Sequence, residues 1–117
     1  MAYLMLIVEP RGQRAERCLE AGRGAYAAMV RYAESLKQRG ILRAVESLRH
    51  DRHGARLAVR SGKRTVVDGP FTEAKELVGG FFLLDVATRA EALACAGECP
   101  AAQWATIEVR EIGPCYE

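Results

Sequence analysis

The stretch Asp68–Glu76 reads D-G-P-F-T-E-A-K-E, a tight turn followed directly by a charged segment. An aspartate at the first position of a turn accepts backbone amides, and the Gly-Pro step that follows fixes the bend. Apolar segments flank the stretch, Thr65–Val67 before it and Phe81–Val86 after it. The pattern therefore predicts a sharp connection between strands, with Thr72 capping a short helical turn that Gly79-Gly80 ends.

Two continuous apolar runs, Tyr3–Val8 and Phe81–Val86, have the length of strands that are buried on both faces. Gly79-Gly80 lacks the strand-loop-helix setting of a phosphate loop and indicates a bulge or a close approach of strands. The segments Ile41–Leu48 and Trp104–Ile112 alternate as edge strands with one wet face do. We expect the two continuous runs to lie inside the sheet and the two alternating segments at its edges.

Two amphipathic helices are expected between these strands. From about Arg23 to Arg39 apolar residues recur at helical spacing, and Gly40 can take the left-handed conformation just past the end. The second helix begins with a capping box at Thr88–Glu91 and is closed by Pro100. The apolar stripe expected to be buried on the first helix consists of Tyr26, Met29, Val30, Ala33 and Leu36.

The element order is strand, helix, strand, inserted hairpin, strand, helix, strand, which is the ferredoxin-like split βαβ sandwich of the α+β class. The inserted hairpin pairs Leu57–Arg60 with Thr65–Val67. Two helices cover only one face of the sheet, and each apolar side chain left on the other face forgoes about 1.5–3 kcal/mol of burial. We therefore expect a homodimer in which two sheets pack face to face.

Length and charge restrict the class of protein further. The 117 residues suit a single domain over residues 1–117. The net charge of +2 comes from 17 basic and 15 acidic residues that are spread along the chain, so no direct contact with nucleic acid is expected. The first apolar run is far shorter than a membrane span and has no basic residues before it. These features favour a cytoplasmic protein without membrane contact.

The cysteines and histidines suggest neither disulfides nor a metal site. Without a signal peptide, free thiols are expected at the four cysteines, which are Cys18, Cys95, Cys99 and Cys115. His50-x-x-His53 and Cys95-x-x-x-Cys99 have spacings similar to those of zinc ligands. The sequence does not place these two pairs together, so we expect no metal and no cofactor.

The stretch Asp68–Glu76, together with Val78-Gly79-Gly80-Phe81, resembles the signature of the DGPF subgroup of the YCII-related domain family, whose usual form is D-G-P-F-A-E-T-K-E. The apolar start, the helix before Gly40, Gly62-Lys63 and Glu108-Val109-Arg110 are similar as well. The resemblance implies a dimeric α+β barrel of ferredoxin-like protomers.

The resemblance also implies two different kinds of function. Relatives in the wider family are similar to small-molecule enzymes that use a His and Asp pair, among them a dehydrochlorinase of aromatic degradation. The DGPF subgroup often occurs beside or fused to extracytoplasmic-function sigma factors, which implies an accessory role in transcription. The sequence leaves both open, and with them the question whether the protein is an enzyme.

Asp68 is the first catalytic candidate, since a carboxylate at a turn can act as a general base or orient a histidine. The structural alternative is that Asp68 only caps the turn. His50 and His53 are candidate partners because an imidazole titrates near neutral pH. Their alternative is an exposed charged loop.

Four further residues are candidates for binding a substrate. Phe71 would cover a pocket whose rim carries Glu73 and Lys75, and Lys75 with Arg60 would hold a carboxylate or phenolate. The structural alternative is that Glu73 and Lys75 begin a helix, where the acid offsets the macrodipole.

The sequence thus favours a homodimer that binds a small anionic or aromatic molecule, with acid/base activity of a lyase or isomerase kind. The alternative hypothesis is a non-catalytic partner of a sigma factor.

Overall fold

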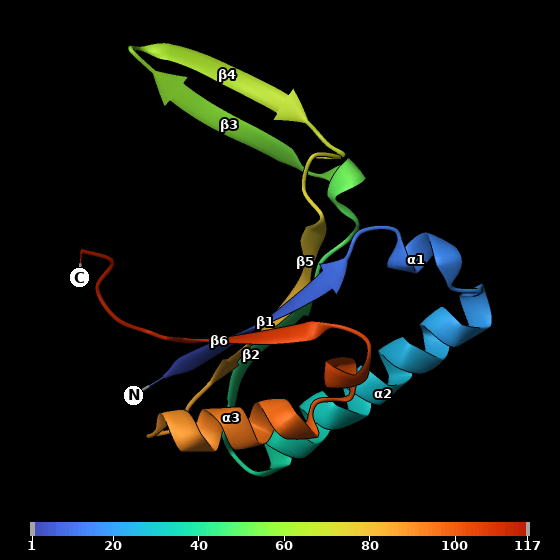
Figure 1. Cartoon of the computed structure of the whole chain (residues 1–117). Helices are drawn as coiled ribbons and strands as arrows, with labels where there is room; N and C mark the ends of the chain where they lie inside the picture. The colour runs from blue at the N-terminus through green and yellow to red at the C-terminus, as the bar shows by residue number, and fades with distance from the viewer. Residues whose placement is uncertain (1, 117) are drawn as a thin grey trace.

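The computed structural model describes residues 2–116 and contains the predicted split βαβ order with an inserted hairpin (Figure 1). The elements are β1 (Tyr3–Pro10), α1 (Gln13–Glu16), α2 (Leu19–Gln38), β2 (Leu42–Ser47), η1 (Asp51–His53), β3 (Ala55–Arg60), β4 (Lys63–Asp68), β5 (Glu76–Leu84), α3 (Arg89–Glu98), η2 (Pro100–Gln103) and β6 (Thr106–Glu111). The ferredoxin-like α+β fold is therefore confirmed.

The main sheet is antiparallel and has the strand order β2-β5-β1-β6. β1 and β5 are the inner strands, paired from Tyr3 opposite Leu84 to Pro10 opposite Glu76. These are the two segments whose continuous apolar runs predicted an inner position. β2 and β6 lie at the edges, as their alternation predicted.

The core lies between the sheet and the helices. Met5, Leu36 and Leu84 are fully buried there, and Tyr32 of α2 meets Phe82 of β5 edge to face with ring centroids 5.3 Å apart. The opposite face of the inner strands carries apolar side chains that stay partly exposed. These are Leu4, Leu6, Val8, Phe81 and Leu83, called the open sheet face below.

The hairpin of β3 and β4 forms a separate two-stranded sheet that projects away from the body (Figure 1). We call residues 55–68 the arm. Its tip is the turn at Ser61-Gly62, and its root is the pair Ala55 and Asp68. The arm confirms the predicted hairpin, with both strands longer than expected.

The first long helix differs from the prediction in its start and in its buried stripe. It begins at Leu19 rather than near Arg23, because the Cys18 side chain accepts the Ala21 amide and caps it. Tyr26 and Val30, expected to be buried, are 61% and 51% exposed. The reason is that the N-terminal part of α2 stands off the sheet and leaves a groove.

No helix follows Thr72 in the described residues, where a single turn, closed by the Ala74 amide donating to the Phe71 carbonyl at 3.0 Å, leads to β5 at Glu76. Arg11 binds the segment after this turn, since its Nε donates to the carbonyl of Ala74 at 2.7 Å and its backbone amide donates to that of Lys75 at 2.9 Å. These bonds hold the chain against the end of β1, so it continues into β5 rather than into a longer helix. Gly79-Gly80 lies inside β5 rather than at a helix end, where the register shifts opposite Ile7 and Val8, so the predicted bulge is confirmed.

All four cysteines are free thiols, as expected, and Cys95 and Cys99 are buried in the core. Burial raises the pKa of both buried thiols. Across residues 2–116, no helix combines the length and the apolar character needed to cross a bilayer.

Candidate functional site

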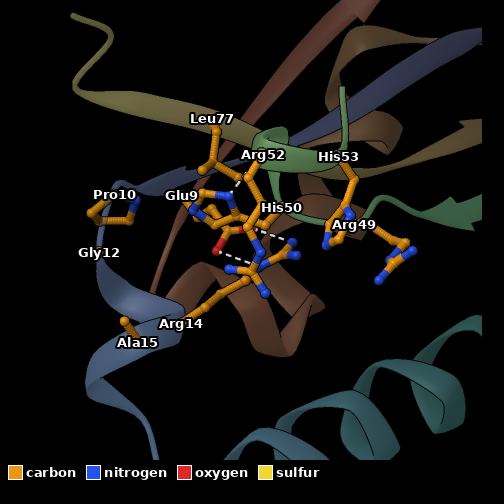
Figure 2. A pocket seen from close by; sticks show the side chains of 10 residues that line it. All are labelled: Glu9, Pro10, Gly12, Arg14, Ala15, Arg49, His50, Arg52, His53 and Leu77. Atoms are coloured by element: carbon orange, nitrogen blue, oxygen red, sulfur yellow. Dashed lines mark hydrogen bonds and ion pairs between the residues drawn. The ribbon is translucent and has the colours of Figure 1, made fainter. Parts of the chain in front are cut away.

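A cavity of about 390 Å³ lies where the end of β1, α1, the loop before η1 and the start of β5 come together (Figure 2). Its volume falls within the ~300–1,000 Å³ of small-molecule sites. The lining residues are Glu9, Pro10, Gly12, Arg14, Ala15, Arg49, His50, Arg52, His53 and Leu77.

Positive charge dominates this cavity, which we call the cationic cavity. Arg14, Arg49 and Arg52 supply guanidinium groups, and His50 and His53 supply imidazoles. Glu9 is the one acid in the lining, and Arg14 neutralises it with Nη2 2.6 Å and Nε 3.1 Å from Oε1. Within residues 2–116, neither Arg49 nor Arg52 takes part in an ion pair. The cavity therefore keeps positive charge available for an anion.

Glu9 is a site residue that was not identified from the sequence. It continues the core-facing series of β1 after Ile7 and is only 7% exposed. Gly79, in the bulge of β5, makes room for it by having no side chain, because a Cβ there would lie 2.1 Å from Glu9 Oε1 and 3.0 Å from Arg14 Nη2. An acid on the buried face of an apolar strand, followed by Arg14, was the available signal.

His50 has a defined tautomer. Its Nδ1 accepts the backbone amide of Arg52 at 3.1 Å, so Nδ1 carries no hydrogen in that bond. In the neutral imidazole Nε2 must then carry the hydrogen. His50 is thus prepared to donate a hydrogen bond to a ligand from Nε2. Asp51 Oδ1 lies 3.3 Å from the same Nδ1.

His53 differs from His50 in its surroundings. Its backbone amide donates to the carbonyl of His50 at 3.0 Å, which fixes the distance between the two residues along the loop. Desolvation, followed by the positive charges of Arg49, Arg52 and His50, lowers the pKa of His53. The ring is consequently neutral at pH 7 and able to accept a proton.

The loop that carries both histidines is held by an ion pair between Arg11 and Asp51. Arg11 Nη1 donates to Asp51 Oδ1 at 3.1 Å, and Nη2 donates to Oδ2. Asp51 Oδ2 also accepts the amide of Phe71 at 3.4 Å. The hydrogen bond from Arg11 lowers the pKa of Asp51, so the carboxylate stays ionised. This pair joins β1, the histidine loop and the Asp68–Glu76 stretch at one point.

Gly69 makes the closest backbone approach in this region. A Cβ at this position would lie 1.8 Å from the carbonyl oxygen of Asp51, and its amide donates to the carbonyl of Gly54 at 2.9 Å. The peptide bond between Gly69 and Pro70 is cis. The glycine is therefore required to seat the turn against the histidine loop.

A larger cavity of about 950 Å³ adjoins the first between α2 and the sheet, and we call it the helix groove. The two share Glu9, Arg14 and Arg49 in their linings. Its apolar lining includes Ile7, Met29, Phe82 and Trp104, together with the exposed Tyr26. A charged cavity thus opens onto an apolar groove.

The structure brings only the two histidines, among the residues singled out as a site from the sequence, into the cationic cavity. Asp68 lies exposed at the root of the arm and lines neither of these two cavities. Arg60 lies at the tip of the arm, about 17 Å along the strands from the root. The catalytic role of Asp68 and the binding role of Arg60 stay predictions.

Phe71, Glu73 and Lys75 surround the arm root rather than the cationic cavity. The guanidinium of Arg56 lies 3.9 Å from the ring centre of Phe71 and bonds Glu73 at 2.6 Å. Arg56 thus occupies the position beside Phe71 that the sequence suggested for Arg60. Lys75 contributes its backbone carbonyl to Arg11.

Comparison with protein families agrees with the ferredoxin-like architecture. The YCII-related domain model matches residues 1–115, so the chain belongs to the YCII-related domain family.

Among solved structures, one with a similar fold is the 5-chloro-2-hydroxyhydroquinone dehydrochlorinase TftG from Burkholderia phenoliruptrix AC1100, in complex with 2,5-dihydroxybenzoquinone. The TM-score is 0.55 at 17% sequence identity, over 97% of this chain and 94% of that chain. At this identity the likeness shows the fold. No curated protein matches the sequence.

Proposed function

We propose that this protein binds a small organic anion, with the anionic group in the cationic cavity and an aromatic or apolar body in the helix groove. The observation that carries the proposal is the charge balance of the cationic cavity. Its single carboxylate, Glu9, is already paired with Arg14, whereas Arg49 and Arg52 form no ion pair among residues 2–116. Such guanidinium groups favour carboxylate or phenolate oxygens.

The joined cavities suit an amphipathic ligand. An anionic group would be held by Arg49 and Arg52 and by the Nε2 hydrogen of His50. A ring attached to it would extend past Arg14 toward Met29, Phe82 and Trp104. Planar apolar bodies with one charged end gain both burial and charge-assisted hydrogen bonds in such a site.

The two imidazoles support proton transfer as the accompanying chemistry. His53, neutral because its pKa is lowered, would accept a proton from a carbon or hydroxyl of the ligand. His50 would donate a hydrogen bond to an oxygen that gains negative charge, and the arginines would stabilise that charge. This is proton chemistry of a lyase or isomerase kind. The dehydrochlorinase with a similar fold, whose bound molecule is an oxygenated ring, is in keeping with it.

We propose further that the protein is a homodimer through its open sheet face. Leu4, Leu6, Val8, Phe81 and Leu83 form a continuous apolar patch across the inner strands. Burying side chains of this size contributes about 1.5–3 kcal/mol each. The same sheet face of a second copy supplies a matching apolar surface.

Binding of benzoate, compared with the uncharged benzamide, tests the anion site by calorimetry. The two probes have the same shape and differ in charge. We expect benzoate to bind at least about tenfold more tightly, since a hydrogen bond to a charged group contributes about 1.5–3 kcal/mol. Equal affinities would contradict the proposal.

Turnover is tested separately with hydroxylated aromatic compounds, including 2,5-dihydroxybenzoquinone. We expect His53→Gln to abolish the exchange of carbon-bound protons of the ligand for solvent deuterium, while benzoate still binds. Asp68→Ala, assayed alongside, tests the prediction that Asp68 is the base. If Asp68→Ala abolishes exchange and His53→Gln leaves it intact, the acid/base role belongs to Asp68.

A further inference from the structure

The arm contacts the rest of the protomer at its root, where Arg56 lies over the ring of Phe71 and bonds Glu73. Both of its strands are exposed along almost their whole length, and only Ala58 is partly buried. In Figure 1 the arm extends from the body without a helix or strand beside it. An isolated two-stranded hairpin is at best marginally stable in water. We therefore expect the paired strands of the arm to be stabilised by contact with another surface.

One face of the arm has the composition of an interface. Leu57 lies opposite Val66, and Val59 follows on the same face. These three side chains are 55%, 50% and 54% exposed. Ala55 lies on this face as well, with Arg64 toward the tip and Asp68 at the root. The other face carries four polar residues, Arg56, Arg60, Lys63 and Thr65, together with Ala58 and Val67. The first face is therefore the more apolar of the two, and its three large apolar side chains are each at least half exposed within residues 2–116.

The whole protomer is too extended for a compact monomer. Its accessible surface is 8090 Å², whereas a compact protein of this mass exposes about 6,300 Å². Its radius of gyration is 16.0 Å, against about 13.4 Å for a compact domain of this length. The surplus of about 1,800 Å² exceeds the ~800 Å² that each partner buries in a standard interface. A second copy of the chain is the occupant that this surplus fits.

We infer that the arm reaches across to a second copy of this chain and packs Leu57, Val59 and Val66 against it. The inference rests on the homodimer proposed above and adds the arm to the interface. In a dimer with a two-fold axis every contact occurs twice, so both arms and both open sheet faces are buried in one assembly. On the other face Arg60 and Lys63 stay in solvent near the tip, and Arg56 keeps its contact with Phe71 at the root.

Two neighbouring substitutions on β4 test the inference. Val66→Asp places a charge on the apolar face, and Thr65→Asp places the same charge on the opposite face of the same strand. Sedimentation equilibrium of the full chain measures the dimer dissociation constant. We expect Val66→Asp to raise it at least about tenfold, because a buried charge replaces an apolar contact twice per dimer. Thr65→Asp should leave it unchanged within about twofold.

Hydrogen exchange of the wild-type chain supplies a second measurement that needs no variant. The arm amides should exchange slowly above the dimer dissociation constant and quickly below it. A wild-type monomer at all concentrations would overturn both the homodimer and the arm contact. A dimer that Val66→Asp leaves intact, with arm amides that exchange equally fast at all concentrations, would overturn the arm contact alone.

Discussion

The stretch Asp68–Glu76 and the loop Arg49–His53 meet at the root of the arm but differ in how their polar groups are used. In the first, Ala74 and Lys75 give their carbonyls to Arg11, and Glu73 pairs with Arg56. In the second, Arg49, Arg52 and His53 face a cavity. The stretch with the most recognisable sequence therefore positions the loop, while the less distinctive loop presents the groups that can do chemistry.

Gly69→Ala is expected to have the largest effect, since it breaks the contact between the two regions. The added Cβ would lie 1.8 Å from the Asp51 carbonyl oxygen, so the backbone must shift. We expect a loss of about 1–3 kcal/mol of unfolding free energy or more in urea denaturation.

Gly24→Ala is the matched control for this substitution. Gly24 lies within α2, and a Cβ there meets nothing within 4 Å. The same change should stabilise the protein by about 0.5–1 kcal/mol. Equal destabilisation by both variants would show that the close approach of Gly69 to Asp51 is not the cause of the loss.

Asp51→Asn is expected to act next, by breaking the ion pair with Arg11. The pKa of Asp51 is lowered in the folded state, so its contribution to stability is present above the unfolded pKa of about 3.9 and is lost as pH falls through the folded pKa. The variant should melt at a lower temperature at pH 7, and the difference from wild type should shrink toward pH 3.

Asp68→Asn supplies the comparison from the other region. Asp68 is exposed, and no ion pair among residues 2–116 includes it. Its melting curve should overlay that of the wild type at both pH values. A large loss of stability in this variant would show that Asp68, and not only Asp51, stabilises the contact between the two regions.

Removing the guanidinium groups of the loop should weaken anion binding without loss of stability. We expect Arg49→Ala and Arg52→Ala each to lower benzoate affinity by about tenfold, from the loss of one charge-assisted hydrogen bond. Arg64→Ala on the arm removes the same charge outside both cavities and should leave the affinity unchanged. Calorimetry at constant ionic strength measures all three.

The smallest expected effect is the pH dependence of benzoate binding. Since the pKa of His53 is lowered in the free protein, an anion nearby should raise it, and binding then takes up a proton. Affinity should rise as pH falls from about 7.5 to about 5.5, by less than about tenfold in total. His53→Gln should flatten the curve, and an unchanged slope would exclude His53 as the titrating group.

The sequence predicted the sheet well because burial on both faces leaves a direct pattern. The continuous runs of β1 and β5 identified the inner strands, and alternation identified the edges. The prediction of a helical turn after Thr72 gave way to a single turn, because a distant residue, Arg11, binds the carbonyls of Ala74 and Lys75 and holds the chain against the end of β1. Local propensity cannot report such a contact.

The site was predicted only in part, because cavities are formed by residues far apart in the chain. His50 and His53 were found through their chemistry, and both line the cationic cavity. Glu9 and Arg14 were missed, although an acid in register with Ile7 on a buried strand face was a usable signal. Arg60 was expected to hold a ligand beside Phe71, but Arg56 is the arginine that lies over this ring, and its place depends on where the arm leaves the body.

Anion binding at the histidines is tested most directly by NMR of the ¹⁵N-labelled imidazoles during titration with benzoate and with benzamide. We expect benzoate to raise the pKa of His53 and to shift the Nε2 resonance of His50, while benzamide leaves the pKa of His53 unchanged. Saturation by benzoate without a change in the pKa of His53 or in the His50 resonance would contradict binding in the cationic cavity.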